Sequence, residues 1–206
     1  MHNVFSSPDT KNDWTIHGIW PTKKHRIGPS YCNDDYEFDA DQIKDLVPEL
    51  EDRWTDIHDE SDRYGFWKHE WEKHGTCAMQ LPSMANEYLY FKKALELQVR
   101  FNATTLLTKA GIFPGRAYEP EFVIKSLTDV MGPSNYIHPA ISCAYDRKYE
   151  SRMFYELIVC LDKNFNLIGC EETAGGLTGS CRLRPMVYPD TINAPSYFNN
   201  RNLLSK

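Results

Sequence analysis

The chain has 206 residues, 41% of them hydrophobic and 25% charged, which is typical of a globular protein with one sizeable core. The formal net charge of −6 argues against nonspecific nucleic-acid binding. Protonation of all seven His would bring it to +1, so an acidic compartment would remove the repulsion towards a polyanion. No apolar run approaches the roughly 20 residues of a membrane-spanning helix. We expect one domain over residues 1–206.

The first part of the chain is predicted to form one strand, a loop and two helices. Residues 1–13 are polar and are expected to be loose. The run 14–21 is apolar and β-branched and ends in Pro, which favours a strand, and 22–38 is expected to be a loop. Asp39 can cap a helix, which Pro48 should kink or end. Residues 65–78 are predicted to form a second helix.

Helices continue through the middle of the chain, and strands follow. Apolar spacing and end signals predict helices beginning at Ser83, over 104–110 and over 119–131. The apolar run 153–161 and the segment 164–170 are predicted to form a β-hairpin. The tail from about residue 190 is expected to be irregular. Helices in the middle and strands at both ends indicate an α+β fold.

Six cysteines without a C-x-x-C pair favour three disulfides over a zinc site, although the count alone does not choose the pairing. The predicted hairpin brings Cys160 and Cys170 close together. Asn102 begins an N-x-T glycosylation sequon, which with the cysteines indicates a secretory route. The first residues carry neither a basic nor an apolar leader segment. We therefore expect a removed signal peptide or a fragment, with a cytosolic protein as the less favoured alternative.

The segment 66–77, FWKHEWEKHGTC, gathers two His, two Glu, two Lys, three aromatic residues and a Cys. It is similar to the zinc motif H-E-x-x-H with one residue inserted. His69 and His74 are five residues apart, about 140° around a regular α-helix, and this spacing disfavours a shared metal ion. A zinc hydrolase is therefore a disfavoured alternative.

Acid–base chemistry suits the same segment better. On a helix Glu70 and His74 share a face, and Lys73 lies beside both. An exposed helix with Glu–Lys pairs is the alternative explanation. The aromatic residues and Cys77 favour burial instead, and a half-buried patch of mixed charge is where shifted pKa values are found.

A second informative segment is WTIHGIWP, residues 14–21. His17 lies in an apolar strand, where a histidine is more often part of the core than a catalyst. Gly18 permits close approach of a neighbouring group. By the two-residue period of a strand, Trp14 and Trp20 are expected on one side, as core residues or as a platform for a base.

Together, WTIHGIWP and FWKHEWEKHGTC resemble the two signature segments of the ribonuclease T2 family, and a looser similarity covers roughly residues 12–190. The resemblance implies a T2-like antiparallel sheet with helices packed on it, and metal-independent cleavage of single-stranded RNA through a 2′,3′-cyclic phosphate, without a cofactor. It implies His74 as general base, His17 as general acid, His69 as a phosphate ligand, and Glu70 with Lys73 at the pentacovalent phosphorus. Glu70 is also expected to raise the pKa of His74, favouring an acidic optimum.

The resemblance also implies base sites, disulfides and location. Trp20 and Tyr31 would flank the 5′ base, and Phe66 and Trp67 would stack on the 3′ base. The implied disulfides are Cys32–Cys77, Cys143–Cys181 and Cys160–Cys170. A secreted or lysosomal monomer is expected, which does not cleave DNA.

Two departures from the family pattern bear on activity. Thr22 stands where the family commonly has an Asp that helps to read the 5′ base, which puts the base preference in question. Family members also carry an N-terminal strand ahead of WTIHG, and we expect it to be missing here. The alternative function is therefore a catalytically impaired T2-fold RNA-binding or effector protein.

Overall fold

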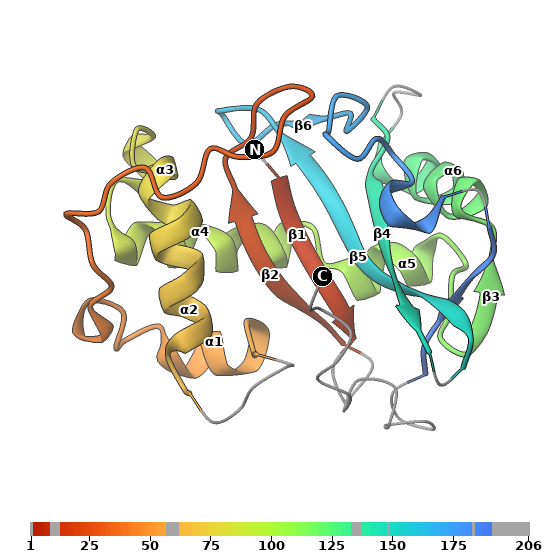
Figure 1. Ribbon diagram of the computed structural model, residues 1–206, viewed down its shortest axis with the longest axis horizontal. Coiled ribbons are helices and arrows are strands. Elements are labelled where there is room, and N and C mark those ends of the chain that lie inside the picture. The colour runs from red at the N-terminus through yellow and green to blue at the C-terminus, as the bar shows by residue number, and fades with distance from the viewer. Residues whose placement is uncertain are drawn as a thin grey trace.

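The computed structural model describes residues 2–8, 13–56, 62–132, 137–147, 149–182 and 184–190, with backbone alone for 2–8. In this part of the chain seven strands form one sheet, with helices beside and behind it (Figure 1). The predicted α+β class is confirmed. The tail expected to be irregular lies outside the described residues beyond Asp190.

Five strands follow one another across the sheet in the order β2-β1-β5-β7-β3, and β4 and β6 also pair with β5. All pairings are antiparallel except the parallel bridge between β5 and β7. The predicted hairpin is present as β5 and β6. The strands are β1 (His2–Pro8), β2 (Trp14–Trp20), β3 (Arg116–Tyr118), β4 (Ala140–Asp146), β5 (Ser151–Leu161), β6 (Leu167–Ile168) and β7 (Met186–Tyr188).

The expectation of a loose N-terminus without a strand is wrong for residues 2–8. They form β1, which lies between β2 and β5 and pairs antiparallel with both. The segment HNVFSSP has no apolar run to signal a strand. Its backbone N–H and C=O groups are satisfied by two neighbouring strands, which a polar sequence permits as readily as an apolar one. An impaired enzyme, expected only if this strand were missing, therefore loses its structural basis.

The helices have the bounds α1 (Val47–Arg53), α2 (Gly65–Glu70), α3 (Thr76–Ala78), α4 (Glu87–Arg100), α5 (Ala103–Lys109) and α6 (Pro120–Met131). A π-helical turn, Trp71–Gly75, joins α2 to α3. The predicted start at Ser83 is wrong: α4 begins after Asn86, whose side chain accepts from the Leu89 N–H. Asp39 caps only a 3₁₀ turn, and Pro48 lies in the first turn of α1 instead of ending a helix, since its missing N–H costs nothing there.

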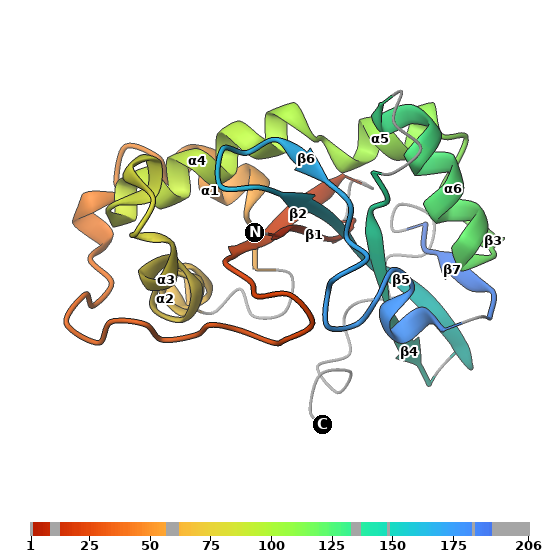
Figure 2. The ribbon, with the colours of Figure 1, turned by 90° about the horizontal axis from the view of Figure 1, so that it is seen from above.

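The sheet is covered on one face by α4 and α5, while α2 and α3 lie beside β2 (Figure 2). Tyr90 of α4 is fully buried, and its hydroxyl donates to the Ile19 carbonyl (3.1 Å) and lies 3.4 Å from the Glu70 carbonyl. The Trp54 indole donates to the His17 carbonyl (2.9 Å). These bonds fix β2 against the helices that carry the candidate site. No described helix has the length and apolar character to span a membrane.

All three implied disulfides are present. Cys32–Cys77 ties the loop after β2 to α3, and Cys143–Cys181 ties β4 to the C-terminal segment. Cys160–Cys170 links β5 to the segment after β6, as the hairpin suggested. Three disulfides fit an extracellular or lysosomal protein.

Candidate active site

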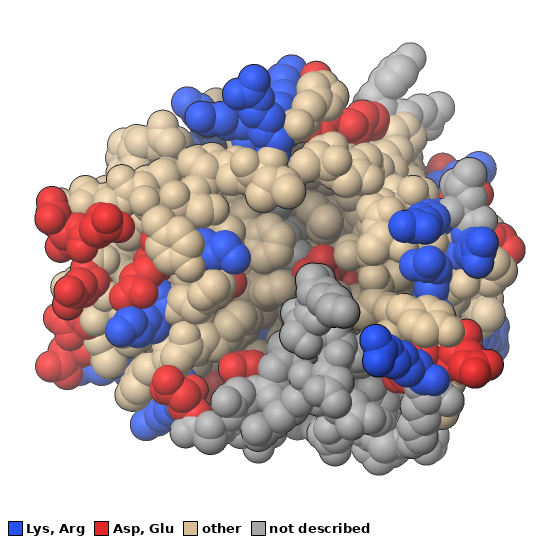
Figure 3. Space-filling model, viewed as in Figure 1, with Lys and Arg blue, Asp and Glu red and all other residues tan. Residues whose placement is uncertain are grey.

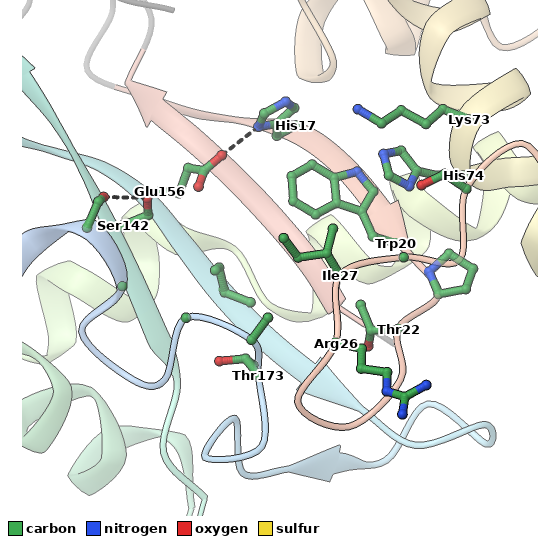
Figure 4. Close-up of a pocket in the computed structure, with 18 of the residues that line it drawn as sticks. His17, Trp20, Thr22, Arg26, Ile27, Lys73, His74, Ser142, Glu156 and Thr173 are labelled. Carbon is green, nitrogen blue, oxygen red and sulfur yellow. Dashed lines mark hydrogen bonds and ion pairs between the residues drawn. The ribbon is translucent and has the colours of Figure 1, made fainter. Parts of the chain in front are cut away.

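A cavity of about 480 Å³ opens on the face of the sheet away from α4 and α5. One wall comes from β2 and the α2–π-turn segment, and another from β4 and β5 (Figure 4). The loop 22–30 and the glycine-rich segment 173–180 complete it. This volume lies within the range of small-ligand sites.

His17 and Trp20 reach this cavity because β2 carries a bulge. Val4 of β1 pairs with Gly18 while Phe5 pairs with Ile16, so His17 is an extra residue on β2. A bulge changes which way the following side chains point, and bulges are common beside active sites. The expectation that Trp14 and Trp20 serve one surface is therefore wrong. Trp14 is buried and donates to the Tyr188 hydroxyl, whereas Trp20 lines the cavity.

The motif FWKHEWEKHGTC is helical, as predicted, but it is not one regular α-helix. The Thr76 N–H bonds to the Trp71 carbonyl five residues back, the mark of a π turn. Such turns are frequent at functional sites. The end of α2 and the turn together present four of the predicted site residues to the cavity: His69, Glu70, Lys73 and His74.

Gly75 is required by the packing of this turn. A Cβ atom there would lie 2.2 Å from the ring of Trp71, which is itself buried. Trp71 is anchored by an indole bond to the Tyr36 carbonyl (3.0 Å). The glycine before Thr76 in the motif is thus explained by the close approach of an aromatic ring.

The His17 imidazole is held by a carboxylate from β5. Its Nδ1 lies 2.8 Å from Glu156 Oε1, and both side chains are largely buried, at 24% and 13% exposure (Figure 4). Burial by itself lowers the pKa of His17. The hydrogen bond and charge of Glu156, with the charge of Glu70, outweigh burial and raise the pKa above its ordinary value. These interactions therefore favour the protonated form of His17.

Glu156 was not identified from the sequence. The signal available was a single charged residue inside the apolar run MFYELIVCL. A carboxylate almost never lies in such a strand unless it has a partner. Only the pairing of β1 between β2 and β5 shows that this partner is His17.

Glu70 is 1% exposed and accepts a hydrogen bond from the Trp20 indole (2.9 Å). Its burial raises its pKa to about 7, against the opposing effects of His17, Trp20 and Lys73. Gly18 makes room for this pair, because a Cβ atom there would lie 2.0 Å from Glu70 Oε2. The close approach expected at Gly18 is therefore that of a carboxylate on the neighbouring helix.

His74 has the opposite protonation to His17. Burial, together with the positive charges of Lys73, His69 and His17, lowers its pKa to about 3. The expectation that Glu70 raises this pKa is wrong, because burial and the neighbouring positive charges dominate, and the Glu70 carboxylate accepts from the Trp20 indole instead. The His74 ring stacks on the Trp20 indole at 5.0 Å, and its Nδ1 has no hydrogen-bond partner among the described residues. His74 is thus a neutral imidazole over most of the acidic range.

His69 and Lys73 form the cationic end of the cavity. Lys73 Nζ lies 3.4 Å from His69 Nε2. Partial burial and the charges of Lys73 and His17 lower the pKa of His69. A bound anion beside this pair would oppose those positive charges. Among the described residues no group of three or more His, Cys, Asp or Glu could hold a metal ion.

The residues implied for base binding fall into different places. The Phe66 ring lies 5.8 Å from the His17 ring. Trp67 is 3% exposed and its indole donates to the Trp54 carbonyl, so a base cannot stack on it; its assignment as a base platform is corrected to a packing role. Tyr31 is 54% exposed and does not line the cavity, whereas Thr22 does.

Asn102, the first residue of the glycosylation sequon, caps α5 by accepting a hydrogen bond from the Thr105 N–H.

Comparison with known proteins decides the family. The model of the Ribonuclease T2 family matches residues 2–170. The chain belongs to the ribonuclease T2 family. It is therefore assigned to the T2-type endoribonucleases. Residues 2–8, which form β1, fall inside the match.

Comparison with individual relatives supports the same family. Ribonuclease Oy of Magallana gigas is 35% identical over 190 residues, 91% of this chain and 88% of that protein. Ribonuclease T2 of Danio rerio is 36% identical over 163 residues, 78% of this chain, and this match spans 64% of the relative's length. The crystal structure of human RNase T2 superposes with a TM-score of 0.76 at 32% identity, covering 91% of this chain and 96% of that one.

Proposed function

We propose that this protein cleaves single-stranded RNA by metal-independent transphosphorylation, with His17 as the general acid and His74 as the general base. The observation that carries the proposal is the pair of histidines on one cavity with opposite pKa shifts. Groups whose pKa values are pushed apart can serve as acid and base at the same pH. Between about pH 3 and the raised pKa of His17, one ring is neutral and the other is charged.

In the first step the neutral His74 accepts the proton of the ribose 2′-OH, whose oxygen attacks the adjacent phosphorus. The P–O5′ bond breaks, and the charged His17 gives its proton to the leaving O5′. The products are a 2′,3′-cyclic phosphate and a free 5′-OH. Lys73 and His69 would stabilise the added negative charge on the phosphorane oxygens. DNA, which lacks the 2′-OH, has no nucleophile for this step.

Glu70 would act as a neutral carboxylic acid at acidic pH, since its pKa is raised to about 7. In that state it can donate a hydrogen bond to a phosphoryl oxygen instead of repelling it. Trp20, beside His74, and Phe66, beside His17, are the aromatic rings positioned to contact bases. Thr22 at the cavity wall supplies a hydroxyl where an Asp would supply a charge, so the base preference should differ from that of relatives with Asp.

The test is mass spectrometry of a short RNA oligonucleotide incubated with the protein at about pH 5 in excess EDTA. We expect fragments ending in 2′,3′-cyclic phosphate, and no cleavage of the DNA of the same sequence. Intact RNA from folded protein would refute the proposal. Cleavage that EDTA abolishes would instead support a metal-dependent hydrolase.

Glu156 is a positioning residue in this scheme, and its charge should set the alkaline limit of activity. Glu156→Gln keeps an acceptor for His17 Nδ1 but removes the charge that raises the pKa of His17. The acid must be protonated to act, so the alkaline limb of the kcat/KM profile should move to lower pH. Glu121→Gln, at an exposed position of α6, is the matched control and should leave the limb in place. An unmoved limb in Glu156→Gln would show that His17 is not the titrating acid.

The three disulfides and the acid-suited site together support a secreted or lysosomal location. We expect the protein to act as a monomer, and sedimentation of the purified protein tests this directly.

A further inference from the structure

The loop after β2 carries four consecutive basic residues, Lys23 to Arg26, in a chain whose net charge is −6. All four are exposed. Lys and Arg side chains gather over this loop at the top of Figure 3, whereas the largest group of Asp and Glu lies along the left edge of that view. Such a concentration on one rim of the cavity is the electrostatic footprint expected for a polyanion.

The loop is an ordered turn. Lys23 and Arg26 are bridged across it, and the His25 N–H donates to the Glu172 carbonyl (2.7 Å). Lys24 Nζ lies 2.7 Å from the Glu172 carboxylate, which anchors the turn to the segment after Cys170. The charges of Lys24 and Glu172 therefore offset each other, and Lys24 is not counted as a free cation.

Lys23 and Arg26 remain unpaired. Neither side chain has a hydrogen bond or ion pair with another described residue. Arg26 lines the cavity, and in Figure 4 the rings of Trp20 and His74 lie between it and Lys73. Arg26 is therefore separated from the cations proposed to hold the reacting phosphate, and would meet a different phosphate of the same strand.

We infer that Lys23 and Arg26 form a subsite for an RNA backbone phosphate beyond the scissile one. The inference rests on the proposed function, since it presumes an RNA strand in the cavity. Contacts between cations and phosphates carry no base information, but they position the strand and release counterions. The subsite should favour chains longer than a dinucleotide.

Salt dependence of binding tests the inference. The probe is a short 2′-O-methyl oligoribonucleotide, which lacks the nucleophile and is bound without being cut. Each phosphate contact on a single strand contributes about 0.7 to the slope of log Kd against log salt, so losing this one phosphate contact in Lys23→Ser with Arg26→Ser should lower the slope by about 0.7. A fourfold rise in salt should therefore weaken wild-type binding about 2.6-fold more than binding by the double variant.

The matched control is Lys92→Ser with Lys109→Ser, which removes the same charge from exposed positions on α4 and α5. The salt slope of this control should equal that of the wild type. The slope of Arg26→Lys, which keeps the charge, should also be unchanged. An unchanged slope in Lys23→Ser with Arg26→Ser would overturn the inference. An equal drop in the slope of the control variant would overturn it too.

A dinucleoside monophosphate, with only the scissile phosphate, separates the two proposals. The loop variant should cleave it with unchanged kcat/KM. If the wild type does not cleave it, the proposed function fails, while the binding slopes still report on the subsite by themselves.

Discussion

Replacing His17 or His74 with alanine should lower kcat/KM for a dinucleoside monophosphate by about 10²–10⁴-fold, the usual contribution of a general acid or base. In the proposed mechanism, His17→Ala removes the proton donor for the leaving 5′-oxygen, and His74→Ala removes the acceptor for the 2′-OH proton. If the two act in one step, the double variant should lose little more than the worse single variant, because each loss already disables that step.

Folding must be preserved for this test to be clear. The Trp54 indole donates to the backbone carbonyl of residue 17, and this bond does not depend on the imidazole, so His17→Ala should keep β2 in place. His25→Asn is the matched histidine control: it is exposed, and its backbone has φ = 54°, which Asn tolerates. It should retain activity on the dinucleoside substrate. Full activity in folded His17→Ala or His74→Ala would end the mechanism.

Lys73→Ala should lower kcat/KM by about 10²–10³-fold, because it removes a fixed charge aimed at the developing phosphorane. It should also change the pH profile. The charge of Lys73 helps to lower the pKa of both His74 and His69. Without it the pKa of His74 rises from about 3, and since a base acts when neutral, the acidic limb should move to higher pH.

Lys68→Ala is the control on the same helix. Lys68 is exposed, lies 3.8 Å from Glu72 and does not line the cavity, so its loss should affect neither rate nor profile. A Lys73 variant that loses rate without moving the acidic limb would separate phosphate stabilisation from the tuning of His74. One that keeps full rate would remove Lys73 from the proposed mechanism.

Much of the site was predictable because its signals are local. The segment FWKHEWEKHGTC places its polar residues on neighbouring turns whatever the rest of the chain does, and all four of its predicted catalytic and phosphate-binding residues line the cavity. The β5–β6 hairpin and the Cys160–Cys170 disulfide are also local, because the two partners are ten residues apart. Helix starts were less secure, since Asn86 and Ser83 are both good caps and only the hydrogen bonds distinguish them.

Other features depend on contacts between distant parts of the chain. β1 is a strand because β2 and β5 bond to both of its edges. The bulge at His17 depends on the register of that pairing, and it decides that Trp20 faces His74 and not the core. Trp67 was assigned to a base site by the motif, but tertiary packing buries it.

The sequence by itself determined the fold class, the family, the two histidine-bearing segments and the hairpin disulfide, because each depends on short-range spacing and residue type. Only the tertiary structure shows what shifts the pKa values of His17 and His74 in opposite directions. A pKa depends on burial and on the distance to other charges, and the carboxylate that controls His17 lies 139 residues away in the chain. The opposite pKa shifts that support the proposed roles of the two histidines are therefore a property of the folded molecule.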